Sequence, residues 1–203
     1  MEPLSFEDIE VVSRASVQNA GELLEEAELL VRNGRYARSF FLARIALEEV
    51  MKPILFSFAG VALVTRRDPN WAGLDQALRA HTVKMRYALQ SFAAVMELLG
   101  NPLPEGALDQ MMDHVHELNR RKNEALYVSH HPVDGALPNE KFNEEQAAFM
   151  ITFAAGFVAA AETHDYSRAS IEQLAQSEQA RGEAEAAQRA YGEDGEARED
   201  ELP

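Results

Sequence analysis

Apolar residues recur every three or four positions along most of the chain, which is the spacing of one face of an α-helix. In the first stretch, from about Ser5 to Asn33, that face is formed by Ile9, Val12, Ser16, Ala20, Leu23, Ala27 and Leu30. Ser5 lies three residues before Asp8, as in an N-terminal capping box, and Asn33-Gly34 is a pair that ends helices. The pattern therefore predicts a long amphipathic helix at the start of the chain.

Three further helices follow from the same spacing. The second covers about residues 35–64 and is apolar on most sides, as expected of a helix at the centre of a bundle. Pro53 is expected to bend it, because proline has no N–H to donate. The third is predicted over residues 71–99 and the fourth over residues 105–127, each ending at a loop that contains proline.

A fifth helix is predicted to begin near Asn143. It contains the near-apolar run 147–161, which has 15 residues and is shorter than the roughly 18–20 of a membrane span. We interpret this run as a buried core helix. No stretch shows the alternation of a strand, so the fold class is all-α. We expect a bundle of four or five long antiparallel helices over residues 1–167, and a helical extension with a disordered acidic tail over residues 168–203.

Composition and charge exclude several classes of site and of partner. The 203 residues include no cysteine, which excludes a disulfide scaffold, a cysteine zinc site and a thiol nucleophile. Nineteen Lys and Arg stand against 34 Asp and Glu, a formal net charge of −15. That balance argues against a surface that follows nucleic-acid phosphates in general, so we expect neither DNA nor a membrane as a partner. Residues 1–10 do not have the pattern of a secretory signal, so we expect the protein to act in the cytoplasm.

Charged residues interrupt the apolar second helix. Arg44, Glu48 and Lys52 are four residues apart and therefore share one stripe, and Glu49 lies beside it. Charges on a buried helix must be paired, because their desolvation is costly. The stripe is either a ladder of ion pairs facing a small wet gap, or a polar binding site inside the bundle.

The third helix carries His81 on its apolar stripe, with Lys84 one turn later. His81 is either a core histidine satisfied by Glu48 or Glu49, or a ligand-binding or acid–base group. The Glu-x-x-His pairs of di-metal bundles are absent, and so are the glycine-rich motifs of nucleotide-binding enzymes. We therefore expect no metal and no cofactor.

The fourth helix holds the densest group of basic residues in this acidic chain. His116, Arg120 and Tyr127 share one face, which is either simply solvated or an arginine-centred site for a phosphate or RNA. The other candidates in this region are Arg121, Lys122, Asn123 and, in the following loop, His130.

Several of these pieces together resemble the AbiV family of abortive-infection proteins. They are Asn19 to Leu24 with Ala27, Gly34 to Ser39, Ala46 to Lys52, His81 to Lys84, and an arginine shortly before Leu126-Tyr127-Val128. The resemblance extends over about residues 16–161.

The resemblance implies a HEPN-like helical bundle that dimerises. It also implies a role in phage defence and metal-independent RNA cleavage, in which a histidine moves the 2′-hydroxyl proton and an arginine holds the phosphate. HEPN ribonucleases have four to six residues between that arginine and the histidine. This chain instead has Arg120 followed by Ala125 and Tyr127, and His116 or His130 would have to substitute.

Three functions remain open from the sequence. The first is an RNase effector that acts as a homodimer, with Arg120, Arg121, Tyr127 and His116 as catalytic residues. The second is a non-catalytic defence protein that binds a phage or host protein and blocks translation. The third is a small-ligand sensor whose pocket is lined by Glu48, Glu49, His81 and Lys84.

Overall fold

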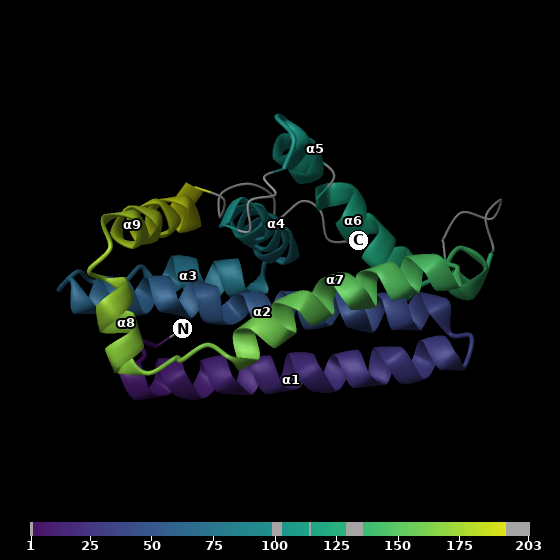
Figure 1. The fold of residues 1–203 in the computed structure, drawn as a ribbon, viewed down its shortest axis with the longest axis horizontal. Coiled ribbons are helices and arrows are strands. Elements are labelled where there is room, and N and C mark those ends of the chain that lie inside the picture. The colour runs from purple at the N-terminus through teal and green to yellow at the C-terminus, as the bar shows by residue number, and fades with distance from the viewer. Residues whose placement is uncertain (1, 99–102, 114, 129–135, 194–203) are drawn as a thin grey trace.

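Two long helices form the base of the molecule. The structure is a computed structural model that describes residues 2–98, 103–113, 115–128 and 136–193. Helix α1 (Phe6–Arg32) packs against α2 (Tyr36–Val64), and α7 (Glu144–Glu162) lies over both of them (Figure 1). The shorter helices are α3 (Trp71–Arg79), α4 (His81–Leu98), α5 (Ala107–Asp113), α6 (Val115–Glu124), the 3-10 helix η1 (Pro138–Glu140), α8 (Arg168–Leu174) and α9 (Glu178–Glu193). The described residues contain no strand, and the all-α bundle is confirmed.

Helix α1 begins where the sequence predicts. The Ser5 hydroxyl accepts a hydrogen bond from the Asp8 N–H at 3.1 Å, and the Asp8 carboxylate accepts one from the Ser5 N–H at 2.9 Å. At the other end, Gly34 has a φ of +66°, a left-handed conformation that favours glycine. Asn139, which is distant from this turn in the sequence, forms hydrogen bonds with it. Its amide nitrogen donates to the Gly34 carbonyl at 2.9 Å, and its amide oxygen accepts from the Ala37 N–H at 3.2 Å.

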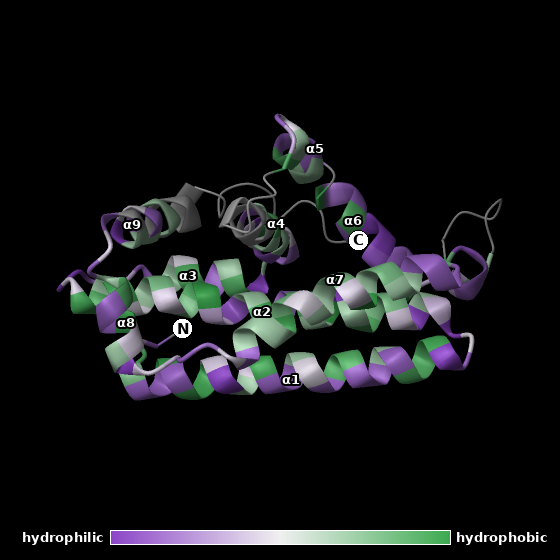
Figure 2. Ribbon diagram, viewed as in Figure 1, coloured by the Kyte–Doolittle hydropathy of each residue, from purple (hydrophilic) through white to green (hydrophobic). Residues whose placement is uncertain are grey.

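Helix α2 is the centre of the molecule. More than half of its 29 residues are buried, and it contacts α1, α7 and α4 on different sides. Figure 2 shows the consequence in hydropathy: α1 alternates hydrophilic and hydrophobic residues, whereas α2 and α7 are hydrophobic over long stretches. The helix continues through Pro53, and the Ser57 hydroxyl donates to the Pro53 carbonyl at 2.9 Å.

The prediction of one continuous third helix is wrong. It is broken at Ala80, whose backbone is extended with φ −77° and ψ 110°, and α4 starts at His81. The Lys84 ammonium group donates to the Leu78 carbonyl across the break at 2.9 Å. No residue at this position disfavours a helix, so contacts made by α4 with α2 decide where the chain turns. In the region of the predicted fourth helix the structure describes α5 and α6, which lie on either side of residue 114, outside the described residues.

The predicted fifth helix exists, but the run 147–161 is not buried on all sides. Its buried residues face α1 and α2 and are Ala147, Met150, Ile151, Ala154 and Val158. Phe149, by contrast, is 66% exposed. The apolar run therefore predicts the helix correctly and its complete burial wrongly. No helix in the described ranges is long and apolar enough to cross a membrane.

The helical extension after α7 packs back on the bundle. Ile171 of α8 lies so close to Gly60 of α2 that a Cβ added to the glycine would come within 2.9 Å of the isoleucine Cδ1. Ala184 and Ala187 of α9 join the same apolar cluster as Leu55 of α2. The tail predicted to be disordered falls largely in residues 194–203, which lie outside the described residues.

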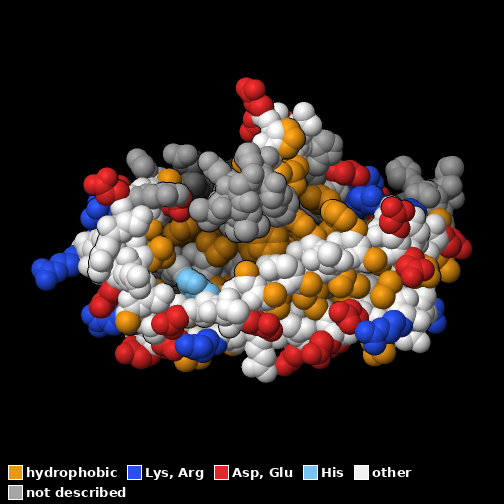
Figure 3. Space-filling model, in the orientation of Figure 1, with side chains coloured by type: hydrophobic (Ala, Val, Ile, Leu, Met, Phe, Trp, Pro, Cys, Tyr) orange, Lys and Arg blue, Asp and Glu red, His pale blue; other side chains and the backbone are white. Residues whose placement is uncertain are grey.

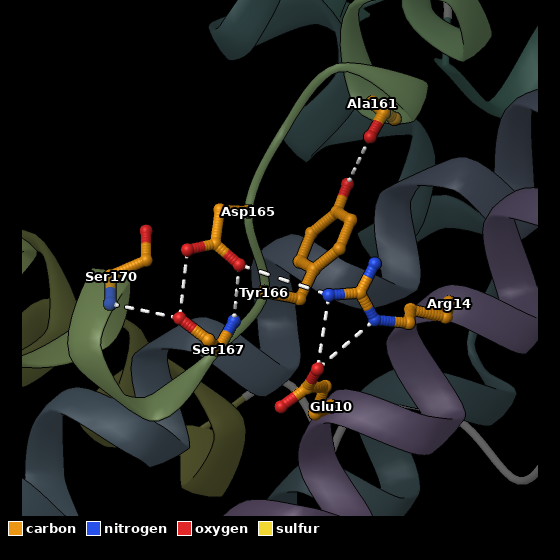
Figure 4. Close-up of polar contacts among 7 residues, drawn as sticks. All are labelled: Glu10, Arg14, Ala161, Asp165, Tyr166, Ser167 and Ser170. Atoms are coloured by element: carbon orange, nitrogen blue, oxygen red, sulfur yellow. Dashed lines mark hydrogen bonds and ion pairs between the residues drawn. The ribbon is translucent and has the colours of Figure 1, made fainter.

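The connection from α7 to α8 is fixed by a surface network (Figure 4). The Ser167 hydroxyl donates to the Asp165 carboxylate at 2.8 Å, and the Tyr166 hydroxyl donates to the Ala161 carbonyl at 3.0 Å. Arg14 of α1 lies 3.8 Å from Asp165 and 3.0 Å from Glu10. These contacts hold the start of α8 next to α1.

Candidate functional site

A group of charged side chains lies inside the bundle, where α2, α4 and α6 meet. We call it the charged cluster, and it consists of Arg44, Glu48, His81, Lys84 and Lys122. The Glu48 carboxylate is its centre and is only 2% exposed. Sequence spacing places Arg44 and Glu48 on one stripe of α2, but the other members come from separate helices.

Each oxygen of the Glu48 carboxylate meets two basic groups. Oε1 is 2.8 Å from Nη1 of Arg44 and 3.6 Å from Nζ of Lys122. Oε2 is 3.4 Å from Nζ of Lys84 and forms a hydrogen bond with Nδ1 of His81. The carboxylate therefore holds three helices together through opposite charges.

These neighbours decide the ionisation of Glu48. Burial alone would raise its pKa, but the His81 hydrogen bond and the charges of Arg44, Lys122 and Lys84 outweigh burial and lower the pKa from 4.5 to about 2. Burial lowers the pKa of Lys84 and of Lys122, and the Glu48 charge opposes part of that shift. Glu48 is thus a carboxylate at neutral pH.

Positive charge exceeds negative charge in this cluster. Arg44 is fully buried, and its Nε and Nη2 atoms find no hydrogen-bond acceptor among the described residues. Three cationic side chains and one histidine surround a single carboxylate. Glu49 and Lys52, predicted to belong to the same site, lie beside the cluster and pair with each other at 2.6 Å.

His81 is the member of the charged cluster that reaches the surface. Its side chain is 48% exposed, whereas Lys84 and Lys122 are buried. Because Nδ1 is hydrogen-bonded to Glu48, Nε2 is the ring nitrogen that remains for a substrate. A buried carboxylate bonded to one imidazole nitrogen fixes the ring orientation and the tautomer, as in histidines that transfer protons. The pair is therefore suited to acid–base chemistry at Nε2.

A groove of about 420 Å³ runs between α1, α2 and α3 on the Glu49 side of the cluster. Its polar lining includes Asn19, Lys52 and Arg79. Arg79, two residues before His81, lies 2.7 Å from Asp75. Both cations of this groove are therefore already paired, Lys52 with Glu49 and Arg79 with Asp75.

The predicted arginine site on α6 has a different character. Arg120 is exposed, and its guanidinium donates to Glu117 on one side and Glu124 on the other. Its charge is therefore balanced by two carboxylates of the same helix. His116 and Tyr127 are exposed on α6 and just after it, and the structure describes no hydrogen bond or ion pair between either of them and Arg120.

Arg121 has a packing contact. Its guanidinium lies 5.1 Å from the ring centre of Phe142 and 6.0 Å from that of Phe40, and the two rings are 4.9 Å apart. A cation over aromatic faces is attracted to them, so this contact fastens α6 to α2. Lys122, the next residue, points to Glu48.

The structure thus brings together four of the predicted site residues, namely Glu48, His81, Lys84 and Lys122. Asn123 is exposed on α6, and His130 lies outside the described residues. Arg44, which spacing places on the same stripe as Glu48 but which was not among the candidate site residues, also belongs to the cluster. Within the described ranges, no group of three or more His, Asp and Glu could hold a metal ion.

Comparison with known proteins gives one positive result. Searches of the curated proteins and of the solved structures found no match. The sequence model of the AbiV family matches residues 8–159 of the 203, which include α2 to α6 and nearly all of α1 and α7. That region contains every member of the charged cluster, and the chain belongs to the AbiV family of HEPN-type proteins.

Proposed function

We propose that this protein is an abortive-infection effector that cleaves RNA without a metal ion, as a homodimer in the bacterial cytoplasm. The AbiV family indicates a defence role. The observation that carries the RNase proposal is the half-exposed His81 whose Nδ1 is hydrogen-bonded to the buried Glu48. It supplies the histidine that is missing from the usual position after Arg120.

The chemistry needs one base close to the 2′-hydroxyl of a nucleotide. Nε2 of His81 would accept that proton, and the 2′-oxygen would then form a bond to the adjacent phosphorus while the bond to the 5′-oxygen breaks. The leaving 5′-oxygen takes up a proton from water, and the protonated His81 returns its own proton to the solvent. The products are a 2′,3′-cyclic phosphate and a 5′-hydroxyl end.

Burial divides the roles of the basic residues. Lys84 and Lys122 are too buried to contact a nucleic-acid backbone, so they position His81 indirectly by keeping Glu48 ionised. Arg120 is exposed and would exchange Glu117 or Glu124 for a phosphate. His81 is thus assigned to proton transfer, and Arg120 to binding.

The test is cleavage of single-stranded RNA by the purified protein in EDTA. His81→Gln should lower kcat at least about 100-fold, the low end of what a general base contributes. Arg120→Ala should mainly raise KM. His164→Gln, which changes a histidine of the α7–α8 connection, should cleave like the wild type.

His116→Gln separates this assignment from the site predicted on α6 alone. Loss of cleavage in His116→Gln with normal cleavage in His81→Gln would place the base on α6 and refute the role of His81. No cleavage by the wild-type protein on any RNA would remove the RNase proposal altogether.

A non-catalytic role is the second candidate, and the pairing of Arg120 with two glutamates favours it, because such a surface has little net attraction for phosphate. In this case the protein binds a phage or host protein and blocks translation. Addition of purified protein to a translation extract distinguishes the two. Inhibition that persists in His81→Gln, with the RNA intact, would support binding over cleavage.

A further inference from the structure

The middle of the outer face of α7 carries no charge, although exposed glutamates, Glu144, Glu145 and Glu162, stand at the two ends of the helix. Between Gln146 and Glu162 the helix has no Asp, Glu, Lys or Arg, in a chain whose formal charge is −15. Its exposed positions are Ala148, Phe149, Thr152, Gly156, Ala159 and Ala160. A helix that is apolar on all sides is normally covered on all sides, yet α7 contacts the bundle with one side only. Figure 3 shows hydrophobic side chains along this helix, with acidic and basic side chains over α1 below it.

Two rows of side chains follow this face, each with a spacing of four residues. One row is a ridge of aromatic rings, in which Phe149 and Phe153 are stacked with centroids 6.1 Å apart and Phe153 and Phe157 meet edge-on at 5.3 Å. Phe149 is the exposed ring of this row, whereas Phe153 and Phe157 are half-buried and also pack against the core. The other row is made only of small residues, namely Ala148, Thr152, Gly156 and Ala160. At Gly156 an added Cβ would meet nothing within 4 Å. The face therefore has a ridge beside a shallow groove.

We infer that this face binds the same face of a second copy of the chain. A two-fold axis would lay the phenylalanine ridge of each α7 in the small-residue groove of the other, which is ridge-into-groove packing of i, i+4 rows. The inference rests on the homodimer of the proposed function and specifies its surface. We call this surface the α7 face.

Charge favours a second copy over other occupants. Two chains of net charge −15 repel each other, and the repulsion is smallest where the contact surfaces carry no charge. A membrane surface rich in anionic lipid would require lysine or arginine on the α7 face, and it has none. A strongly charged protein partner would find charges to pair with only at the two ends of the helix, at Glu144, Glu145 and Glu162.

The size of the α7 face sets the expected affinity. The small row from Ala148 to Ala160 extends about 20 Å along the helix axis, at about 1.5 Å per residue. One helix pair of this length buries less than the roughly 800 Å² per partner of a standard stable interface. The dimer should therefore be weak and depend on concentration, and Phe149, 66% exposed in the single chain, should contribute most to it.

Light scattering over a protein concentration series tests the α7 face. The wild-type mass should rise toward that of a dimer with concentration. Phe149→Glu places two like charges in the contact, and Gly156→Leu fills the groove; each should weaken the dimer at least about tenfold. Leu29→Glu, the same kind of change at an exposed apolar position of α1, should dimerise like the wild type.

A cross-linking experiment gives an independent readout, because the natural chain has no cysteine. Thr152→Cys, near the middle of the α7 face, should form a disulfide-linked dimer on mild oxidation that dithiothreitol reverses. Leu29→Cys should form no disulfide-linked dimer under the same oxidation. A wild-type protein that is monomeric throughout the series, or equal dimerisation of wild type and Phe149→Glu, would overturn the inference.

RNA cleavage measured on the same samples keeps the two proposals separate. A dimer that depends on Phe149 but cleaves no RNA would refute the RNase and leave the α7 face standing. Cleavage by a protein that dimerises equally well with Phe149→Glu would do the reverse.

Discussion

Glu48→Gln should be one of the most destabilising single changes in this protein. The substitution keeps the size of the side chain but removes the carboxylate charge that compensates Arg44, Lys84 and Lys122, all of which are buried. Removing one partner of a buried ion pair typically costs about 3–5 kcal/mol, because the remaining charge is left uncompensated. The free energy of unfolding of an ordinary domain is about 5–15 kcal/mol, so this loss is a large part of the total.

The pKa of Glu48 gives a second route to the magnitude. A carboxyl whose pKa falls from 4.5 to about 2 on folding contributes about 3 kcal/mol to the free energy of unfolding. This contribution is fully present above pH 4.5. It is lost as the pH falls from 4.5 toward 2, because the unfolded state then binds a proton that the folded state does not.

Urea denaturation of wild type and Glu48→Gln between pH 7 and pH 2.5 measures both effects. The difference in unfolding free energy should be about 3–5 kcal/mol at pH 7 and should shrink below pH 4.5. Glu117→Gln, which removes one carboxylate from the exposed Arg120 pair, is the matched control and should cost no more than about 1 kcal/mol. A difference below about 1 kcal/mol for Glu48→Gln, or one that does not change with pH, would refute this account of the charged cluster.

Three substitutions with smaller expected effects test the packing and the capping of the helices. Gly21→Ala should raise the unfolding free energy by up to about 1 kcal/mol, because the new Cβ lies at an ordinary 3.7 Å from its nearest neighbour. Gly60→Ala should leave the unfolding free energy unchanged or lower it, because its Cβ would come within 2.9 Å of Ile171. Equal melting temperatures for the two variants would contradict that packing. Ser5→Ala removes the cap that Asp8 completes and should cost about 1 kcal/mol in thermal unfolding; an unchanged melting temperature would mean that the cap does not stabilise α1.

Local patterns predicted the parts of the fold that depend on neighbouring residues. The capping box at Ser5 and the central position of α2 are of this kind. The break at Ala80 was not predictable, because no residue there opposes a helix and the turn lets His81 and Lys84 reach Glu48. The open face of α7 was missed for a related reason: a run of apolar residues predicts burial, and only the positions of α1 and α2 show which side stays uncovered.

The candidate site was predictable in its residues but not in its assembly. Spacing placed Arg44 and Glu48 on one stripe, and His81 was expected to meet Glu48 or Glu49. Lys122 belongs to a helix that begins 67 residues after Glu48 in the chain, and its approach to that carboxylate comes from tertiary packing alone. The same packing turns Arg121 away from the site and onto Phe40.

The close contact between Ile171 and Gly60 has a consequence for shortened forms of the chain. A protein cut in the connection after α7 would lose α8 and α9 and uncover the part of α2 around Gly60 and Leu55. Contiguous apolar surface of that kind promotes aggregation. The last helices therefore cover the apolar surface of α2, and we expect proteolysis at residues 163–167 to make the protein aggregate.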